Sequence, residues 1–301
     1  MLETLGLIFS SFDIRDYKAS SSIPKNGFVK EFELKIPRVK SQGNVGSCGA
    51  HVLSCIVEYF NYIQHGIRTE MSVGYIYGNR KETTHKGTGL ILRDALKTLR
   101  MYGDVTKADF PYNIEMPEAE YKYKKQADEL YEKGYVSRIS AYYRVKTVNE
   151  IKAALRHGHP IAIGVKWYSD MKVKNGLLTT DYKGYQGGHC MLLYGWNEKG
   201  WKVQNSWGRS FGNNGTCIIP YDMPIHEAWA VVDNIKDGLE LKKPLSSSTG
   251  KQVAKVINKI GNVAKQVDEK IDTKTITNKI NKKVNSVIDN TIKNVNKLNK
   301  K

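Results

Sequence analysis

The sequence predicts an α+β protein of two lobes with a cleft between them, followed by a C-terminal helical tail. Helix-type spacing of apolar residues dominates between residues 48 and 158. Short runs rich in β-branched and aromatic residues, separated by turn residues, dominate between residues 160 and 221. A helical half followed by a stranded half is typical of the α+β class.

Composition limits the kinds of function that the chain can have. The 301 residues are 40% hydrophobic and 10% aromatic, which is enough for one core of ordinary size. The four cysteines are too scattered for a disulfide scaffold, and no CxxC pair indicates a zinc site. We therefore expect free thiols and neither metal nor cofactor. The four are Cys48, Cys55, Cys190 and Cys217.

The N-terminal residues are a poor secretory signal, because an acidic residue stands third and the stretch has no basic start. No apolar run approaches the ~20 residues that a membrane-spanning helix needs. We expect a cytoplasmic protein, with association with a virion as the alternative.

Four helices are expected in the first half. One begins at Cys48 and ends before Gly66, and its apolar residues are too dense for a surface helix, so it should be mostly buried. A second runs over 89–103, and a charged, exposed one covers 118–134. The fourth, over 147–158, starts with Thr147 and Glu150 in capping-box spacing.

Strands are expected in the second half, and the loop 197–200 should join two of them as a hairpin. These predicted strands cover 160–168, 187–196, 200–207 and 215–221.

The C-terminal part differs from the body, so we predict a domain over 1–238, a linker over 239–250 and a basic amphipathic tail over 251–301. The tail carries 13 Lys and 4 acidic residues, about half of the chain's net charge of +17. Its apolar residues Val253, Val256, Ile260, Val263 and Val267 follow a 3, 4, 3, 4 spacing. This stripe predicts a coiled coil, with self-association or a protein partner favoured over nucleic acid or an anionic membrane.

Cys48 could be a core residue, a metal ligand or a nucleophile. A thiol attacks as thiolate, and the free N–H groups at a helix start lower its pKa. On its own this position favours a core thiol, since cysteine is among the most buried residue types. The segment after residue 186 makes a nucleophile the favoured interpretation. There, His189 begins one predicted strand and Asn205 ends the next.

With these residues the sequence resembles the papain-like cysteine peptidases, in their bacterial or phage branch. His189 and Asn205 follow Cys48 at the family's characteristic spacing. Gln42 stands six residues before Cys48, and NSWG at 205–208 matches the motif after the family's asparagine. The resemblance covers about residues 13 to 234 and does not reach the tail. It implies a helical lobe packed against an antiparallel barrel-like lobe.

The resemblance also implies the roles of individual residues. Cys48 would attack a peptide carbonyl, with His189 as its imidazolium partner and proton donor to the leaving amine. Asn205 would orient His189, and Gln42 with the Cys48 backbone N–H would bind the oxyanion. In the substrate site, the resemblance implies Gly89, Gly188 and Trp207, the last also shielding the contact between His189 and Asn205.

Two positions depart from the family's pattern. Val45 replaces one half of a disulfide, and Gly49 replaces the tryptophan beside the nucleophile, so we expect a more open cleft floor there. Only 41 residues precede Gln42, which leaves no room for a long inhibitory propeptide. How activity is controlled is therefore an open question.

The remaining histidines and thiols have simpler interpretations. We expect His51 to be a packed helix residue, and Cys55, Cys190 and Cys217 to be core thiols. We predict a cysteine endopeptidase acting on peptides or proteins. The alternatives are a catalytically quiet virion or assembly component that keeps the fold, and a hydrolase of cell-wall peptide cross-links.

Overall fold

The structure of the protein, a computed structural model, describes residues 5–11, 13, 16, 27–66, 68–82, 88–111 and 128–233. All of them belong to the compact unit Met1–Leu239. The linker 239–250 and tail 251–301, with the start of the helix expected over 118–134, lie outside the described residues and stay predictions. No helix among the described residues is long and apolar enough to cross a membrane.

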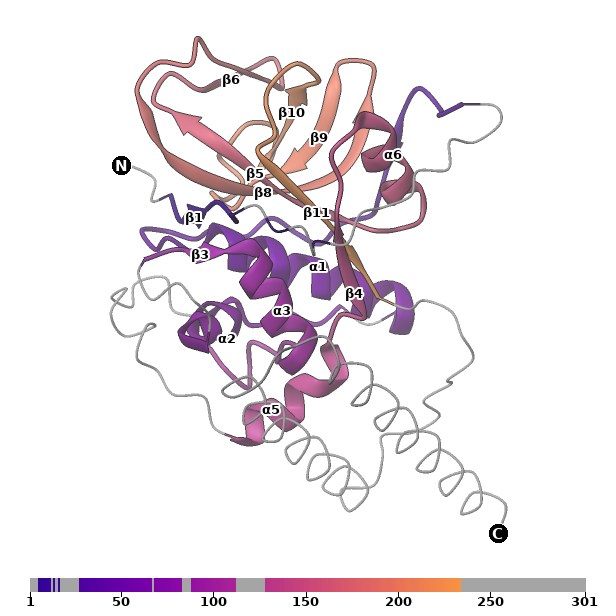
Figure 1. The fold of residues 1–301 in the computed structure, drawn as a ribbon, viewed down its shortest axis with the longest axis vertical. Helices are drawn as coiled ribbons and strands as arrows, with labels where there is room; N and C mark the ends of the chain where they lie inside the picture. The colour runs from indigo at the N-terminus through magenta and orange to yellow at the C-terminus, as the bar shows by residue number, and fades with distance from the viewer. Residues whose placement is uncertain are drawn as a thin grey trace. The chain divides into compact units, whose positions relative to one another are not determined.

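The helical lobe is built around one buried helix. Helix α1, Cys48–His65, is buried through its first 13 residues and ends at Gly66, whose φ of 68° is the left-handed conformation that glycine adopts readily. This bears out the expected buried helix and its stop. The other helical elements are α2 Val73–Gly78, η1 Asn79–Glu82, α3 Leu92–Tyr102, α5 Asp128–Gly134 and η2 Tyr135–Ser137 (Figure 1).

The strand lobe is a mostly antiparallel sheet with the order β4-β11-β5-β8-β9-β10-β7-β6, and β8 lies at its centre. Helix α6, Val148–Arg156, packs beside this sheet and starts with the expected capping box of Thr147 and Glu150 (Figure 1). The strands are β4 Ala141–Arg144, β5 Ile161–Tyr168, β6 Lys172–Lys174, β7 Leu177–Thr179, β8 Tyr185–Asn197, β9 Gly200–Gln204, β10 Thr216–Pro220 and β11 Glu227–Val232. A further short strand, β2 Phe32–Glu33, pairs with β8.

Two short strands meet between the lobes. Strand β1, Leu7–Ile8, pairs in parallel with β3, Leu90–Ile91, and antiparallel with β8 through Gly188 (Figure 1). The expected helix over 89–103 therefore begins at Leu92, because the residues before it are drawn into this pairing. The N-terminal segment thus joins the helical lobe to the strand lobe.

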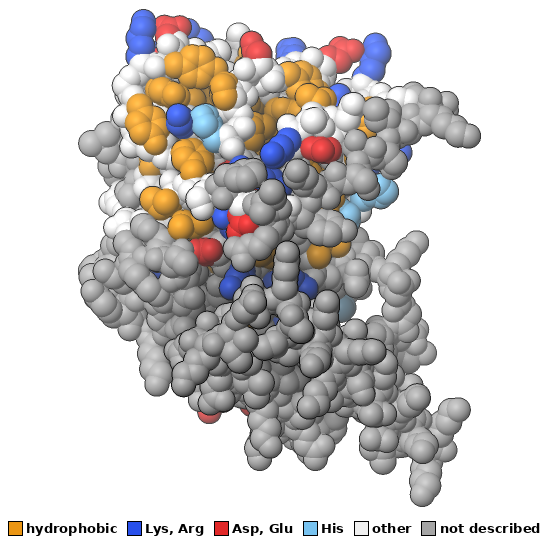
Figure 2. Space-filling model, viewed as in Figure 1, with side chains coloured by type: hydrophobic (Ala, Val, Ile, Leu, Met, Phe, Trp, Pro, Cys, Tyr) orange, Lys and Arg blue, Asp and Glu red, His pale blue; other side chains and the backbone are white. Residues whose placement is uncertain are grey.

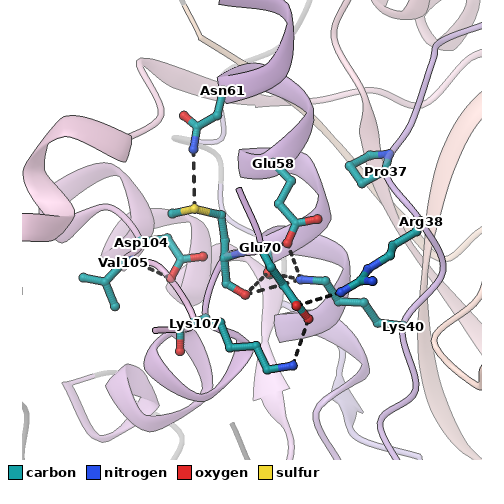
Figure 3. Close-up of polar contacts among 12 residues, drawn as sticks. Pro37, Arg38, Lys40, Glu58, Asn61, Glu70, Asp104, Val105 and Lys107 are labelled. Carbon is teal, nitrogen blue, oxygen red and sulfur yellow. Dashed lines mark hydrogen bonds and ion pairs between the residues drawn. The ribbon is translucent and has the colours of Figure 1, made fainter. Parts of the chain in front are cut away.

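A buried ion pair ties the segment before Gln42 to helix α1. The Lys40 ammonium lies 2.6 Å from a Glu58 carboxylate oxygen, and both side chains are 8% exposed (Figure 3). Lys40 also donates to the Ser54 hydroxyl at 2.7 Å, and Glu58 accepts from the Met71 backbone N–H at 2.7 Å. Burial by itself lowers the pKa of Lys40, yet the acidic groups around it, including Glu58, raise it above its ordinary value.

We expect substitutions at Lys40 and Glu58 to have non-additive effects on the free energy of unfolding. Glu58→Leu leaves the Lys40 charge buried and unpaired, which should lower the free energy of unfolding by about 3–5 kcal/mol. The double variant Lys40→Met, Glu58→Leu removes both charges and should be more stable than Glu58→Leu alone. Denaturant unfolding of Lys40→Met, Glu58→Leu and the double variant gives the interaction free energy between the two side chains.

Arg38→Gln is the control, because Arg38 pairs with Glu70 while its own side chain is 74% exposed (Figure 3). That change should alter the free energy of unfolding by about 1 kcal/mol or less. Strictly additive effects at Lys40 and Glu58 would show that the two charges do not stabilise each other.

Candidate active site

The start of α1 lies beside the loop that carries Asn205. Cys48 is the first residue of the helix and is fully buried. The backbone N–H of Gln42 donates to the Ser206 carbonyl at 2.8 Å, and Ser41 forms a β-bridge with Trp207. These backbone contacts bring the turn before Cys48 against the loop after β9.

His189 and Asn205, which the sequence places on successive strands, are in direct contact. His189 lies in β8, and its Nε2 is 2.8 Å from Oδ1 of Asn205. The Ser206 backbone N–H donates to the same oxygen at 2.7 Å, so this oxygen is the acceptor and Nε2 carries the proton. The other ring nitrogen, Nδ1 of His189, is buried and has no hydrogen-bond partner among the described residues. It is free to act as a base.

Two tryptophans pack against the His189 ring. Trp207 stacks on it with ring centroids 4.5 Å apart, and Trp167 meets its edge at 5.2 Å. Trp207 therefore lies beside the imidazole that contacts Asn205. The two tryptophan rings also pack against each other with centroids 4.7 Å apart, and together they limit the access of water to that hydrogen bond.

Gln42 is held by a residue that the sequence analysis did not single out. Its side-chain NH₂ donates to the Val45 carbonyl at 2.8 Å, and its Oε1 accepts from the Ser206 hydroxyl at 2.6 Å. Ser206 therefore orients both Gln42 and Asn205, the first through its hydroxyl and the second through its backbone. Its place next to Asn205 in the NSWG motif was the available signal.

The N-terminal segment lies against Cys48, which has the Gly6 backbone beside its thiol. The Gly6 carbonyl accepts from the Leu90 N–H at 2.9 Å, and Leu7 pairs with Gly188. An ideal Cβ on Gly89 would come within 2.3 Å of the Gly6 oxygen, and one on Gly188 within 2.3 Å of the Leu7 oxygen. Both glycines expected to contact substrate therefore contact the chain's own N-terminal strand.

Covering the site changes the protonation that the sequence analysis expected. Burial raises the pKa of Cys48, although hydrogen bonds from the backbone of Cys190, Gly6 and Gly49 oppose it. Burial likewise lowers the pKa of His189 to about 4, against the contact with Asn205. The expected lowering of the Cys48 pKa at the helix start is therefore wrong for this closed state, in which thiol and imidazole are neutral.

The expected open floor at Gly49 is also wrong. Leu90 fills the space that a side chain at Gly49 would take, since an ideal Cβ there would lie 2.6 Å from Cδ1 of Leu90. The simpler expectations hold: His51 is buried with Nδ1 3.0 Å from the Ser47 carbonyl oxygen. The other three cysteines, Cys55, Cys190 and Cys217, are free and buried.

Comparison with known proteins agrees with this geometry. The family model described as papain family cysteine protease matches residues 23–225. Xylellain, a cysteine protease from Xylella fastidiosa, has a solved structure that is 26% identical with a TM-score of 0.68, covering 77% of this chain and 96% of that one. This likeness confirms the papain-like two-lobe fold.

Two viral proteins are similar in sequence. A peptidase C1-like protein of Acanthamoeba polyphaga mimivirus, named L477 and described as uncharacterized, is 27% identical over 244 residues, covering 71% of this chain and 76% of that protein. The viral cathepsin of Heliothis zea nuclear polyhedrosis virus is 27% identical over 185 residues, which is 60% of this chain but only 48% of the cathepsin.

The bacterial or phage branch expected from the sequence stays a prediction.

The match of the family model spans about two thirds of the sequence and includes Gln42, Cys48, His189 and Asn205. The chain belongs to the papain family of cysteine proteases and is a hydrolase.

Proposed function

We propose that the chain is a cysteine endopeptidase whose nucleophile is Cys48. His189 takes the thiol proton on Nδ1, and the sulfur attacks the substrate carbonyl carbon. His189 then gives that proton to the leaving amine, and water hydrolyses the thioester to release the acid and restore the thiol. Gln42 and the Cys48 backbone N–H stabilise the oxyanion.

One observation carries this proposal: a continuous set of hydrogen bonds joins His189, Asn205 and Gln42 through Ser206. Asn205 accepts from His189 at 2.8 Å and from the Ser206 N–H at 2.7 Å, and the Ser206 hydroxyl donates to Gln42 at 2.6 Å. A protein that only kept the fold would have no need for a buried imidazole with an unpaired Nδ1. The set therefore supports an enzyme over a catalytically quiet assembly component.

We further propose that the described structure is a latent form. Cys48 and His189 are both fully buried, and β1 occupies the backbone edges of β3 and β8 that flank them. A substrate can reach the sulfur only after β1 leaves. Departure of β1 would then control when Cys48 can react.

The first test opens the site by weakening β1. Leu7 is 3% exposed and Ile8 is 40% exposed, so Leu7→Asp places a charge in the core while Ile8→Asp leaves it in water. Leu7→Asp should speed covalent labelling of Cys48 by a peptidyl epoxide of the E-64 type by about 10²-fold, because burying an unpaired carboxylate is strongly unfavourable. Intact-mass spectrometry gives the labelling rate.

Ile8→Asp is the matched control and should label at the rate of the unaltered chain. Equal rates for the two variants would rule out β1 as the barrier. No labelling of Cys48 in any variant would favour the quiet component over the peptidase.

The second test uses pH. In the unaltered chain, burial raises the Cys48 pKa, so alkylation by iodoacetamide should be slow at pH 7 and rise only as pH approaches that raised value. In Leu7→Asp, the Cys48 sulfur becomes exposed to solvent and the His189 imidazole can carry a positive charge. Alkylation of Cys48 should therefore begin at a lower pH than in the unaltered chain. Burial raises the pKa of Cys55 and Cys217 to about 12, and both should stay unmodified. Rapid alkylation of Cys48 near pH 6 in the unaltered chain would contradict the latent form.

The third test separates the oxyanion donor from the residue that orients it. Gln42→Ala should lower kcat by about 10²–10³-fold through loss of one donor. Ser206→Ala keeps Gln42 but removes the 2.6 Å bond to its Oε1, so kcat should fall less and KM should change little. Steady-state kinetics on a fluorogenic peptide, in the Leu7→Asp background, measures both. Full activity of Gln42→Ala would remove its proposed role.

A further inference from the structure

A large cavity adjoins the His189 side of the site, and the mechanism above does not use it. Its volume is about 990 Å³, near the upper end for small-ligand pockets, and it is lined partly by Trp167 and Trp207. These are the two rings that pack against His189. No described residue of the N-terminal segment lines the cavity, so β1 does not fill it.

The outer wall of this cavity is a fixed hairpin. Strands β6 and β7 are joined by Asn175 and Gly176, both at positive φ of 50° and 78°, as a two-residue hairpin turn requires. The Gly176 carbonyl accepts from the Ile218 N–H at 2.8 Å, which ties the turn to β10. The cavity is therefore a preformed feature of the strand lobe.

The lining carries one charge. Lys172 is the only ionisable residue among the lining side chains, and no carboxylate lies within ion-pair distance of it among the described residues. Neutral polar groups such as Gln186 and Asn213 complete the wall. Trp207 is 9% exposed, and its indole N–H has no hydrogen-bond partner within the described part of the chain. The cavity thus offers donors and a cation.

Charges of both signs are mixed at the surface of the strand lobe. On the face shown in Figure 2, acidic and basic side chains are interspersed along the upper edge of the strand lobe, and hydrophobic side chains gather below them. A broad basic surface for a polyanion is absent from the described residues seen on that face. Because Lys172 is the one ionisable residue in its lining, the cavity fits a single carboxylate better than a polyanion.

We propose that this cavity binds the part of the substrate that follows the cleaved bond, and that Lys172 selects a carboxylate there. The inference rests on the proposed peptidase function. His189 donates its proton to the leaving amine, so the side of the site that its two tryptophans line receives the leaving fragment. The carboxylate can come from an Asp or Glu side chain or from the free C-terminus of the peptide.

Binding of leaving-fragment peptides tests this without relying on turnover. Fluorescein-labelled pentapeptides with a free N-terminus are titrated against the full chain carrying Cys48→Ala, with fluorescence anisotropy as the readout. One peptide has internal Glu and an amidated end, one has internal Gln and a free carboxylate end, and one has internal Gln and an amidated end. The first two distinguish a side-chain carboxylate from a terminal one.

We expect at least one carboxylate peptide to bind about three- to five-fold more tightly than the peptide that lacks one, as for an exposed charge pair. About 0.5 M salt should remove the difference. Lys172→Gln should abolish the preference, and Lys172→Glu should reverse it. Lys174→Gln is the matched control, since Lys174 is exposed on β6 as Lys172 is but lies outside the cavity lining, and this variant should keep the preference.

Equal affinity for all three peptides, no binding of any of them, or the same loss from Lys174→Gln as from Lys172→Gln would overturn the inference. Epoxide labelling of Cys48 reports separately on the peptidase. If Cys48 is labelled but the peptides show no carboxylate preference, the assignment of the cavity is wrong and the proposed peptidase function stands. A carboxylate preference in a chain whose Cys48 never reacts defeats the peptidase and, with it, the assignment of the cavity to a leaving fragment.

Discussion

The pairing of β1 with β3 on one side and β8 on the other is the contact on which the closed geometry depends. It requires backbones to approach closely, and glycine makes that approach possible. An ideal Cβ on Gly6 would come within 1.8 Å of the Gly46 carbonyl oxygen, and one on Gly188 within 2.3 Å of the Leu7 oxygen. Gly188, which the sequence analysis expected to contact substrate, therefore contacts the chain's own N-terminal strand, and Cys48 is fully buried.

Removal from solvent also sets the chemical state of the site. Burial favours the neutral form of each group, so it raises the pKa of the Cys48 thiol and lowers that of the His189 imidazole to about 4. The hydrogen bonds through Asn205, Ser206 and Gln42 are nevertheless already formed. His189, Asn205, Ser206 and Gln42 are thus already connected while the thiol and the imidazole are neutral, and in the latent form that we propose the departure of β1 would change their solvation.

The sequence predicted the parts of the fold whose signals are local. The dense apolar run after Cys48, the stop at Gly66 and the capping box at Thr147 each act within a few residues, and all three hold. The position of His189 against Asn205 came from the resemblance, through motif and spacing. Strand β1 could not be foreseen, because two residues gain their structure only from distant partners. The sequence predicted a lowered Cys48 pKa. The structure shows the opposite direction, because burial raises this pKa by more than the nearby backbone N–H groups lower it.

Amide hydrogen exchange at β1 tests the central claim, that β1 must leave before Cys48 can react. Leu7 and the Leu90 N–H that donates to Gly6 should be protected in the resting chain. After covalent labelling of Cys48 by a peptidyl epoxide, we predict fast exchange across residues 5–9 and unchanged protection in β9 and β10. Protection that persists across residues 5–9 in the fully labelled protein would contradict the account, because the inhibitor would then share the cleft with β1.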